Sequence, residues 1–250
     1  MGNGTIVFIS APPGGGKRLL VRAVHALRQD LVLRMQGARL NIYTDRPRHA
    51  GEKPDKRFHF VSAQEMSRIC ADPDFFAFRQ EGHWSAYDLK QLAEIQARKT
   101  AVCLEKIDAS LIVRLNKVCG IRGINIRTVF LTPFTGKWLT EVYMAGGIES
   151  VRKLVNGHAQ DWLLMEEKKH PSQEKLRRIE REAATAFAIM GFAKDHTHIL
   201  LNRPDLTVKK TMDPFTWTDP RALVALADIL EGNEPLMGET GWPEHIFTPV

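Results

Sequence analysis

The stretch that decides the fold lies near the N-terminus and reads Thr5-Ile6-Val7-Phe8-Ile9-Ser10-Ala11-Pro12-Pro13-Gly14-Gly15-Gly16-Lys17-Arg18. Its first six residues form a continuous β-branched and aromatic run, which is typical of a strand buried on both faces. After the glycines, apolar residues recur at helical spacing, namely Leu19, Leu20, Ala23, Val24 and Leu27. The order is therefore strand, glycine-rich loop, helix.

The loop between this strand and this helix has the composition of a phosphate-binding loop, or P-loop. Glycines let backbone N–H groups close around phosphate oxygens, and the helix N-terminus adds a favourable dipole. A lysine at this place bridges the β- and γ-phosphates of ATP. We therefore predict that ATP is bound by Pro13, Gly14, Gly15, Gly16, Lys17 and Arg18.

The P-loop pattern G-x-x-x-x-G-K-[ST] is broken at two positions. Ala11 replaces the first glycine, which is a mild change, and Arg18 replaces the Ser or Thr that contacts Mg²⁺. A guanidinium group has no lone pair to offer a cation. The sequence therefore predicts phosphate binding without the standard metal coordination.

Three further apolar runs indicate a parallel sheet. They cover residues 100–104, 127–131 and 198–201, and helical patterns alternate with them, including 86–99, 138–155 and 221–230. Such alternation is typical of an α/β fold with a parallel sheet and flanking helices. We expect one domain over residues 1–250, with a helical insertion and lid at residues 133–185.

Composition excludes several classes of protein. The chain has 250 residues, of which 44% are hydrophobic and 26% charged, as in ordinary globular proteins. Its apolar runs are far shorter than the roughly 20 residues that a membrane span needs, and no signal peptide is visible. The three cysteines form no CxxC pair, which favours reduced thiols. We expect a cytoplasmic protein that has no membrane partner.

The positive charge is concentrated at the front of the chain. The net charge is +6, and residues 1–60 hold eleven Lys and Arg against four Asp and Glu. Residues 204–250 hold three basic and eight acidic side chains. A cationic front half indicates a phosphate-rich ligand, which includes nucleotides, sugar phosphates and nucleic acids.

Two motifs downstream of the P-loop give the chain a resemblance to guanylate kinases. The first is Thr44-Asp45-Arg46-Pro47-Arg48-His49-Ala50-Gly51-Glu52, and the second is Phe58-His59-Phe60-Val61-Ser62-Ala63-Gln64-Glu65-Met66. They follow the P-loop in the order and spacing of that family. The resemblance spans about residues 5–110 and 170–230, and it implies a guanylate-kinase-like P-loop fold with an acceptor-binding subregion at residues 40–98.

The resemblance also implies roles for individual residues. The acceptor phosphate would be bound by Arg46 and by Arg48 or His49, beside Phe58, which stands where the family has a tyrosine. Arg177 and Arg178 resemble lid arginines of the catalytic site, and Asn202 resembles the asparagine near the adenine. Asp108 would act catalytically by orienting a water molecule of Mg²⁺, so ATP and Mg²⁺ are the implied cofactors.

The residues with which the family reads guanine are largely replaced. The glutamate position aligns near Ala77, and the segment before the next helix becomes Gly82-His83-Trp84-Ser85-Ala86. The Asp-x-Asp pair becomes Glu105-Lys106-Ile107-Asp108. A site that recognises its substrate through buried polar groups loses discrimination when those groups are lost. His83 and Trp84 are open to two interpretations, a packed aromatic pair or a platform on which a substrate base stacks.

These observations favour an ATP-dependent kinase of the nucleoside monophosphate kinase type, whose acceptor nucleotide need not be GMP. A second hypothesis is a P-loop kinase that phosphorylates a hydroxymethylated base in DNA, as some phage enzymes do, with nucleic acid as its partner. A third is a binding module with a guanylate-kinase-like fold and a degenerate P-loop. The sequence does not indicate the oligomeric state.

Overall fold

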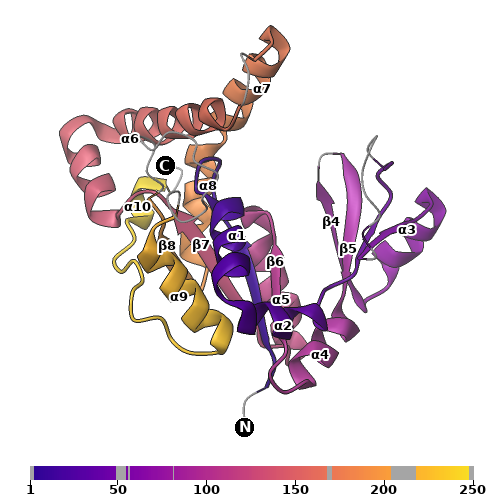
Figure 1. Cartoon of the computed structure of the whole chain (residues 1–250). Helices are drawn as coiled ribbons and strands as arrows, with labels where there is room; N and C mark the ends of the chain where they lie inside the picture. The colour runs from indigo at the N-terminus through magenta and orange to yellow at the C-terminus, as the bar shows by residue number, and fades with distance from the viewer. Residues whose placement is uncertain are drawn as a thin grey trace.

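The core of the protein is a parallel four-stranded sheet. The computed structural model describes residues 3–48, 55, 57–80, 82–167, 171–203 and 218–247. Strands β1 (Thr5–Ser10), β6 (Val102–Lys106), β7 (Arg127–Thr132) and β8 (His198–Leu201) lie in the order β6-β1-β7-β8, with every neighbouring pair parallel (Figure 1). The predicted strands and the predicted α/β fold are confirmed.

Helices cover both faces of this sheet, which explains why the β1 run is apolar throughout. Ile6 and Phe8 pack toward α4 (Leu89–Ala97) and α5 (Ile112–Ile121). Val7 and Ile9 pack in a cluster that includes residues of α1 (Lys17–Leu27), α2 (Gln29–Gln36) and α9 (Pro220–Glu231). Alternate side chains of a strand point to opposite faces, so both sets are buried.

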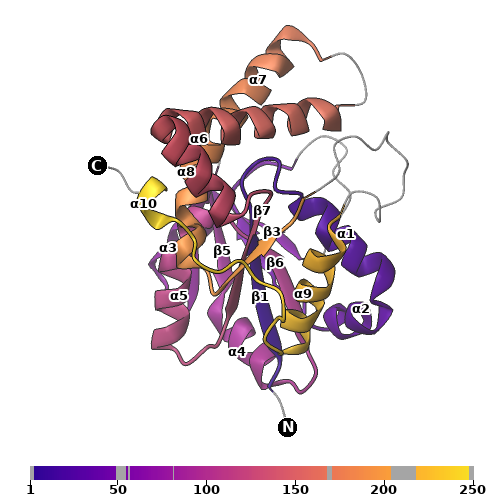
Figure 2. The ribbon, with the colours of Figure 1, turned by 90° about the vertical axis from the view of Figure 1, so that its left-hand side faces the viewer.

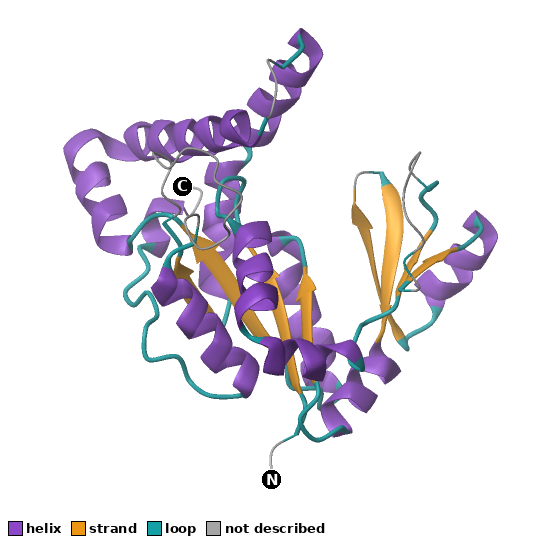
Figure 3. Cartoon of the chain, viewed as in Figure 1, coloured by secondary structure: helices purple, strands orange, loops and turns teal. Residues whose placement is uncertain are grey.

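A second sheet occupies the predicted acceptor-binding subregion. It is formed by β2 (Ile42–Thr44), β3 (Phe58–Phe60), β4 (Phe75–Gln80) and β5 (His83–Asp88), in the order β3-β2-β5-β4 (Figure 3). Helix α3 (Ala63–Ala71) packs on one face of it. The predicted amphipathic stretch at 86–99 is therefore partly wrong. Its first residues belong to β5, and the Asp88 carboxylate caps α4 by accepting from the Lys90 and Gln91 N–H groups.

The long insertion forms a helical layer beyond the carboxyl ends of the parallel strands (Figure 2). Its main helix α6 (Gly136–Glu166) is longer than predicted and is interrupted at Gly146 and Gly147, where Gly147 has a φ of 69°. Helices α7 (Gln173–Ala184) and α8 (Ala186–Met190) and the 3₁₀ helix Gly191–Asp195 lead back to β8. A further 3₁₀ turn (Ala109–Leu111) precedes α5, and α10 (Glu244–Phe247) follows α9 near the C-terminus.

In the described part of the chain, we find no helix with the length and apolar character that crossing a membrane requires.

A buried serine–histidine contact ties the end of β1 to the helical insertion. The Ser10 Oγ and His196 Nε2 atoms lie 2.6 Å apart, and His196 Nδ1 lies 2.8 Å from the Phe192 carbonyl oxygen. A carbonyl oxygen only accepts, so Nδ1 carries the proton and Nε2 accepts from the Ser10 hydroxyl. Burial lowers the pKa of His196 to about 4, although the Phe192 carbonyl opposes this shift. The imidazole is therefore neutral in the folded protein.

This contact predicts a loss of stability in mild acid. The folded pKa of His196 is about 4 and its ordinary value is 6.5, so the unfolded chain takes up the proton first. The stabilisation that the neutral His196 ring gives the folded state is complete above pH 6.5. The free energy of unfolding then falls by about 3 kcal/mol in total as the pH drops toward 4. Urea denaturation across this range should show a smaller pH dependence in His196→Gln than in wild type. His59→Gln, at an exposed position of β3, should behave like wild type; the same pH dependence in all three proteins would contradict the assignment.

Candidate functional site

The P-loop follows β1 and has the backbone geometry that its glycines predict. Gly14 and Gly16 have φ values of 81° and 73°, in the left-handed region that favours glycine. The Gly15 N–H donates to the Pro12 carbonyl oxygen over 3.0 Å. A Cβ atom on Gly15 would lie 2.8 Å from the Cβ atom of Ala11. All three glycines are therefore required by conformation or by space.

Two distant segments hold the P-loop in place. Helix α6 packs directly on it, because a Cβ atom on Gly14 would lie 3.2 Å from both the Ala159 Cα and the Trp162 Cβ atoms. On another side, the Asn202 Nδ2 group donates to the Gly15 carbonyl oxygen over 2.9 Å. Asn202 is fully buried, and its Oδ1 atom accepts from the Asp219 N–H. Asn202 thus links the loop to the start of α9, whereas the resemblance implied a position near adenine.

Lys17 begins α1 and borders a cavity of about 840 Å³. The Asp108 and Lys106 side chains line the same cavity. Burial lowers the pKa of Lys17, Lys106 lowers it further, and Asp108 opposes the shift. Lys17 and Lys106 give the cavity positive charge of the kind that binds a phosphate group. We refer to it as the donor cavity.

One of the two predicted lid arginines reaches the donor cavity. Arg178 of α7 lines it together with Glu182 and Thr185. Arg177 is exposed and is not among the lining residues, and its carbonyl oxygen accepts from the Arg181 Nε group. The structure therefore brings Arg178, but not Arg177, to the P-loop lysine.

The described residues do not fit a magnesium ion held by the protein. The Asp108 Oδ1 atom already accepts from the Ser110 N–H (2.9 Å) and Oγ (2.8 Å) groups. No group of three His, Cys, Asp or Glu side chains suited to a metal occurs among the described residues. Arg18, in place of the usual hydroxyl ligand, pairs instead with Glu166 at the end of α6 over 2.9 Å. Any magnesium ion would therefore enter with a bound nucleotide, as part of the substrate.

A second cavity, of about 650 Å³, lies between the P-loop side of the core and the second sheet. Arg46 and Phe58 line it, as the resemblance implied for an acceptor site. The Arg46 guanidinium lies 5.4 Å from the centre of the Phe58 ring. Arg48 does not line this cavity, and its guanidinium lies over the Phe60 ring at 4.5 Å. His49 falls outside the described residues. We call this space the acceptor cavity.

The acceptor cavity contains a partly buried ion pair that the sequence did not reveal. The Arg57 Nη1 group donates to Glu105 Oε1 over 3.0 Å, while its Nε and Nη2 groups donate to Asp55. Burial raises the pKa of Glu105, and Arg57 opposes this shift. The sequence signal was the pair of charged residues Glu105 and Lys106 at the end of the otherwise apolar strand β6. Since the Glu105 carboxylate is paired with Arg57, it is not available to hydrogen-bond a substrate base.

The second sheet turns two of the predicted base-reading positions away from the acceptor cavity. Ala77 packs with Met66 and Ile69 under α3, whereas its neighbour Phe78 lines the cavity. His83 also lines the cavity, but Trp84 is 40% exposed and does not. Adjacent residues of a strand point to opposite faces. His83 and Trp84 therefore do not form the packed pair that we considered.

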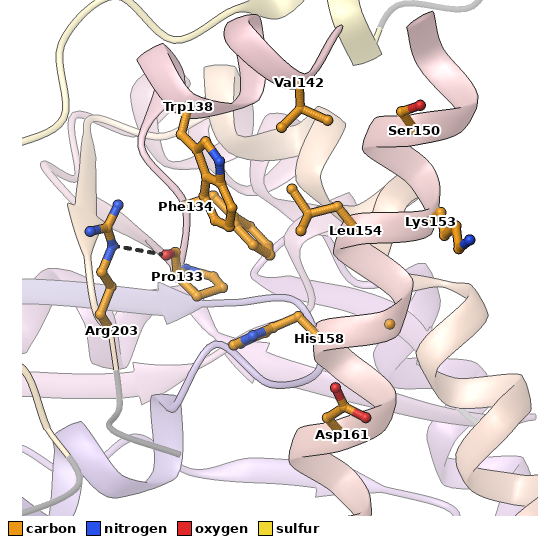
Figure 4. A pocket seen from close by; sticks show the side chains of 11 residues that line it. Pro133, Phe134, Trp138, Val142, Ser150, Lys153, Leu154, His158, Asp161 and Arg203 are labelled. Carbon is orange, nitrogen blue, oxygen red and sulfur yellow. Dashed lines mark hydrogen bonds between the residues drawn. The ribbon is translucent and has the colours of Figure 1, made fainter. Parts of the chain in front are cut away.

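A third cavity, of about 1060 Å³, lies within the insertion and was missed by sequence analysis (Figure 4). Phe134, Trp138 and Leu154 give it apolar walls, and Arg203 closes one side by donating to the Pro133 carbonyl oxygen. The cavity borders the P-loop, since a Cβ atom on Gly14 would lie 3.4 Å from the His158 ring. Among the described residues, the buried His158 Nε2 atom has no hydrogen-bond partner.

Comparison with known proteins finds relatives that are guanylate kinases, the family that the motifs resemble. No family model matches the chain. A guanylate kinase of Xanthomonas oryzae pv. oryzae is 33% identical over 82 residues, which is 32% of this chain and 37% of that protein. A guanylate kinase of Vibrio parahaemolyticus is 29% identical over 80 residues, with the same two shares of 32% and 37%. The chain thus spans little more than a third of the length of these relatives.

Among solved structures, guanylate kinase from Anaplasma phagocytophilum has 16% sequence identity to this chain, with a TM-score of 0.38. That alignment covers 74% of this chain and 84% of the other. The chain is thus similar to guanylate kinases over about a third of its length, and its P-loop and parallel sheet fit the α/β fold of P-loop proteins.

Proposed function

We propose that the protein is an ATP-dependent phosphotransferase of the nucleoside monophosphate kinase type. The observation that carries this proposal is the contact between two cavities. The donor cavity contains Lys17 and Arg178, the acceptor cavity contains Arg46, and Phe78 lies in the wall of both. Two adjoining cationic cavities on either side of a shared wall suit two phosphorylated ligands that exchange a phosphoryl group.

ATP would bind along the P-loop and extend into the insertion. The loop N–H groups and Lys17 would hold the β- and γ-phosphates, and Arg178 would approach the γ-phosphate from α7. The cavity beside Gly14 offers aromatic walls from Phe134 and Trp138 for the purine ring. Asn202 supports this site through the Gly15 carbonyl oxygen.

Phosphoryl transfer requires the protein mainly to position the two substrates and to neutralise charge. An oxygen of the acceptor phosphate attacks the γ-phosphorus in line, while Arg46 fixes the acceptor and Lys17 stabilises the charge that develops. The insertion and α7 lie over the carboxyl ends of the strands (Figure 2) and would keep water from the γ-phosphate.

The acceptor is a nucleotide that need not be GMP. Ala77 faces away from the acceptor cavity and Glu105 is paired with Arg57, so neither offers a free carboxylate to guanine N–H groups. The polar groups left in the wall include Gln80, His83 and Ser85, which suit several bases. The proposal of a broad acceptor range rests on these residues in the lining of the acceptor cavity.

The donor half of the proposal is tested at Lys17. Lys17→Met should lower the transfer rate by about 10³-fold, since a positive group that stabilises developing charge contributes several kcal/mol to the transition state. Initial rates of ADP formation with a monophosphate acceptor measure this. Lys194→Met, at an exposed lysine outside the three cavities, is the matched control. If both variants react at the wild-type rate, the P-loop is not the donor site.

The acceptor half is tested by two arginines that lie two residues apart. Arg46→Gln should raise the KM of the acceptor by about 10- to 100-fold, the size expected for one hydrogen bond to a charged group. Arg48→Gln should change it less than about threefold, because Arg48 lies over Phe60 outside the cavity. Equal effects of the two substitutions would show that the acceptor phosphate binds elsewhere.

Substrate choice is tested with a panel of acceptors. We expect GMP to be preferred over other nucleoside monophosphates by much less than 10⁴-fold, the scale reached when buried polar groups read a substrate. Competition between equimolar monophosphates, followed by chromatography of the diphosphates, gives the ratios. A GMP preference of about 10⁴-fold would contradict the account of the acceptor cavity. If transfer occurs only to duplex DNA with hydroxymethylated bases, the acceptor is DNA and not a free nucleotide.

A further inference from the structure

Lys106 occupies the boundary between the two cavities. Four residues line both the donor and the acceptor cavity, and Lys106 is the one with a charged side chain; the others are Phe78, Gln80 and Tyr87. Sequence comparison with guanylate kinases placed it only between the residues of a broken acidic motif. Its position in the fold shows a cation where the donor and acceptor phosphates would meet.

The backbone fixes this position from both sides. Lys106 is the last residue of β6 and pairs with Ile9 of β1, just before the P-loop. Its carbonyl oxygen accepts a hydrogen bond from the Tyr87 hydroxyl over 3.3 Å. Tyr87 is buried and belongs to the second sheet. Lys106 is therefore tied at once to the sheet that carries the P-loop and to the sheet that carries the acceptor cavity.

The surroundings of Lys106 are cationic. Burial and the nearby Arg18 lower its pKa, and Glu105 opposes the shift. Lys106 in turn lowers the pKa of Lys17. Among the described residues, Lys106 forms no ion pair within 4 Å, while Glu105 pairs with Arg57 and Glu166 pairs with Arg18. The repulsion through which Lys106 lowers the pKa of Lys17 raises the free energy of the empty site, and an anion bound between the two lysines would relieve it.

We propose that Lys106 is a catalytic residue, whose ammonium group contacts the phosphoryl group as it passes from ATP to the acceptor. This rests on the proposed phosphotransferase function. The bond from the γ-phosphorus to the β-phosphate oxygen breaks, and its electron pair stays with ADP. A bond forms from the γ-phosphorus to an acceptor phosphate oxygen, which carries no proton at neutral pH because its second pKa is about 6. Lys106 neutralises the non-bridging oxygens and exchanges no proton.

Lys106 would also supply positive charge that a metal ion held by the protein would otherwise provide. Arg18 stands where the usual hydroxyl ligand of Mg²⁺ would be, and it is held by Glu166. Lys106 then supplies fixed positive charge at the place where charge develops. A donor of this kind typically contributes 10²- to 10³-fold to a reaction rate.

The test compares Lys106→Met with Lys106→Arg. Lys106→Met should lower kcat by about 10²- to 10³-fold, while the Kd of ATP changes less than about threefold. Lys106→Arg should retain far more of kcat and should extend activity to higher pH, because a guanidinium keeps its proton. A structural role would not produce this pH effect. A kcat of Lys106→Met within about threefold of wild type would overturn the proposal.

A binding measurement separates this inference from the proposed function. In calorimetry, a compound that joins adenosine and a second nucleoside through five phosphates should bind Lys106→Met about 10- to 100-fold more weakly than wild type. An unchanged affinity for this compound would overturn the role of Lys106 whether or not transfer is observed. Wild-type protein that forms no phosphorylated acceptor would instead refute the proposed function. Lys106→Met should keep the wild-type melting temperature or exceed it, since it removes a repulsive charge.

Discussion

Close packing around the P-loop backbone is the constraint on which the rest of the site depends. A Cβ atom on Gly14 would lie 3.2 Å from α6, one on Gly15 would lie 2.8 Å from Ala11, and the Gly15 carbonyl oxygen is held by buried Asn202. These contacts leave no room for a side chain and fix the directions of the loop N–H groups. They also join the insertion to the loop, because α6 packs directly against Gly14.

Some of the positive side chains in the front half of the chain line the two cavities, and others form ion pairs within the fold. Lys17 and Arg46 face the two cavities, whereas Arg57 is paired with Glu105 and Asp55, and Arg18 is paired with Glu166. Part of the excess that indicated a phosphate-rich ligand is thus neutralised within the fold. Lys17 follows β1 and Lys106 ends β6, so both lie at the carboxyl ends of these strands, where ligands bind in parallel sheets.

Sequence predicted the core well, because its strands are buried on both faces and read as uninterrupted apolar runs. It did not predict the second sheet, because β2 and β3 have only three residues each and lie among polar motifs. It placed Arg46, Lys17 and Asp108 near the site, but it could not show that Ala77 faces α3 or that Asn202 is a scaffold. The direction of Ala77 depends on strand register, and the role of Asn202 depends on a hydrogen bond between residues 187 positions apart in the sequence. Lys106 was overlooked for the same reason, since its importance appears only where two sheets meet.

The most direct test of the account is to follow the γ-phosphate itself. Wild-type protein, ATP and a mixture of nucleoside monophosphates can be monitored by ³¹P nuclear magnetic resonance. The account predicts that the γ-phosphate signal of ATP decreases as the β-phosphate signals of ADP and of new nucleoside diphosphates increase together. Loss of ATP to free inorganic phosphate alone, or no change in ATP, would contradict the claim that the two cavities form one phosphotransfer site.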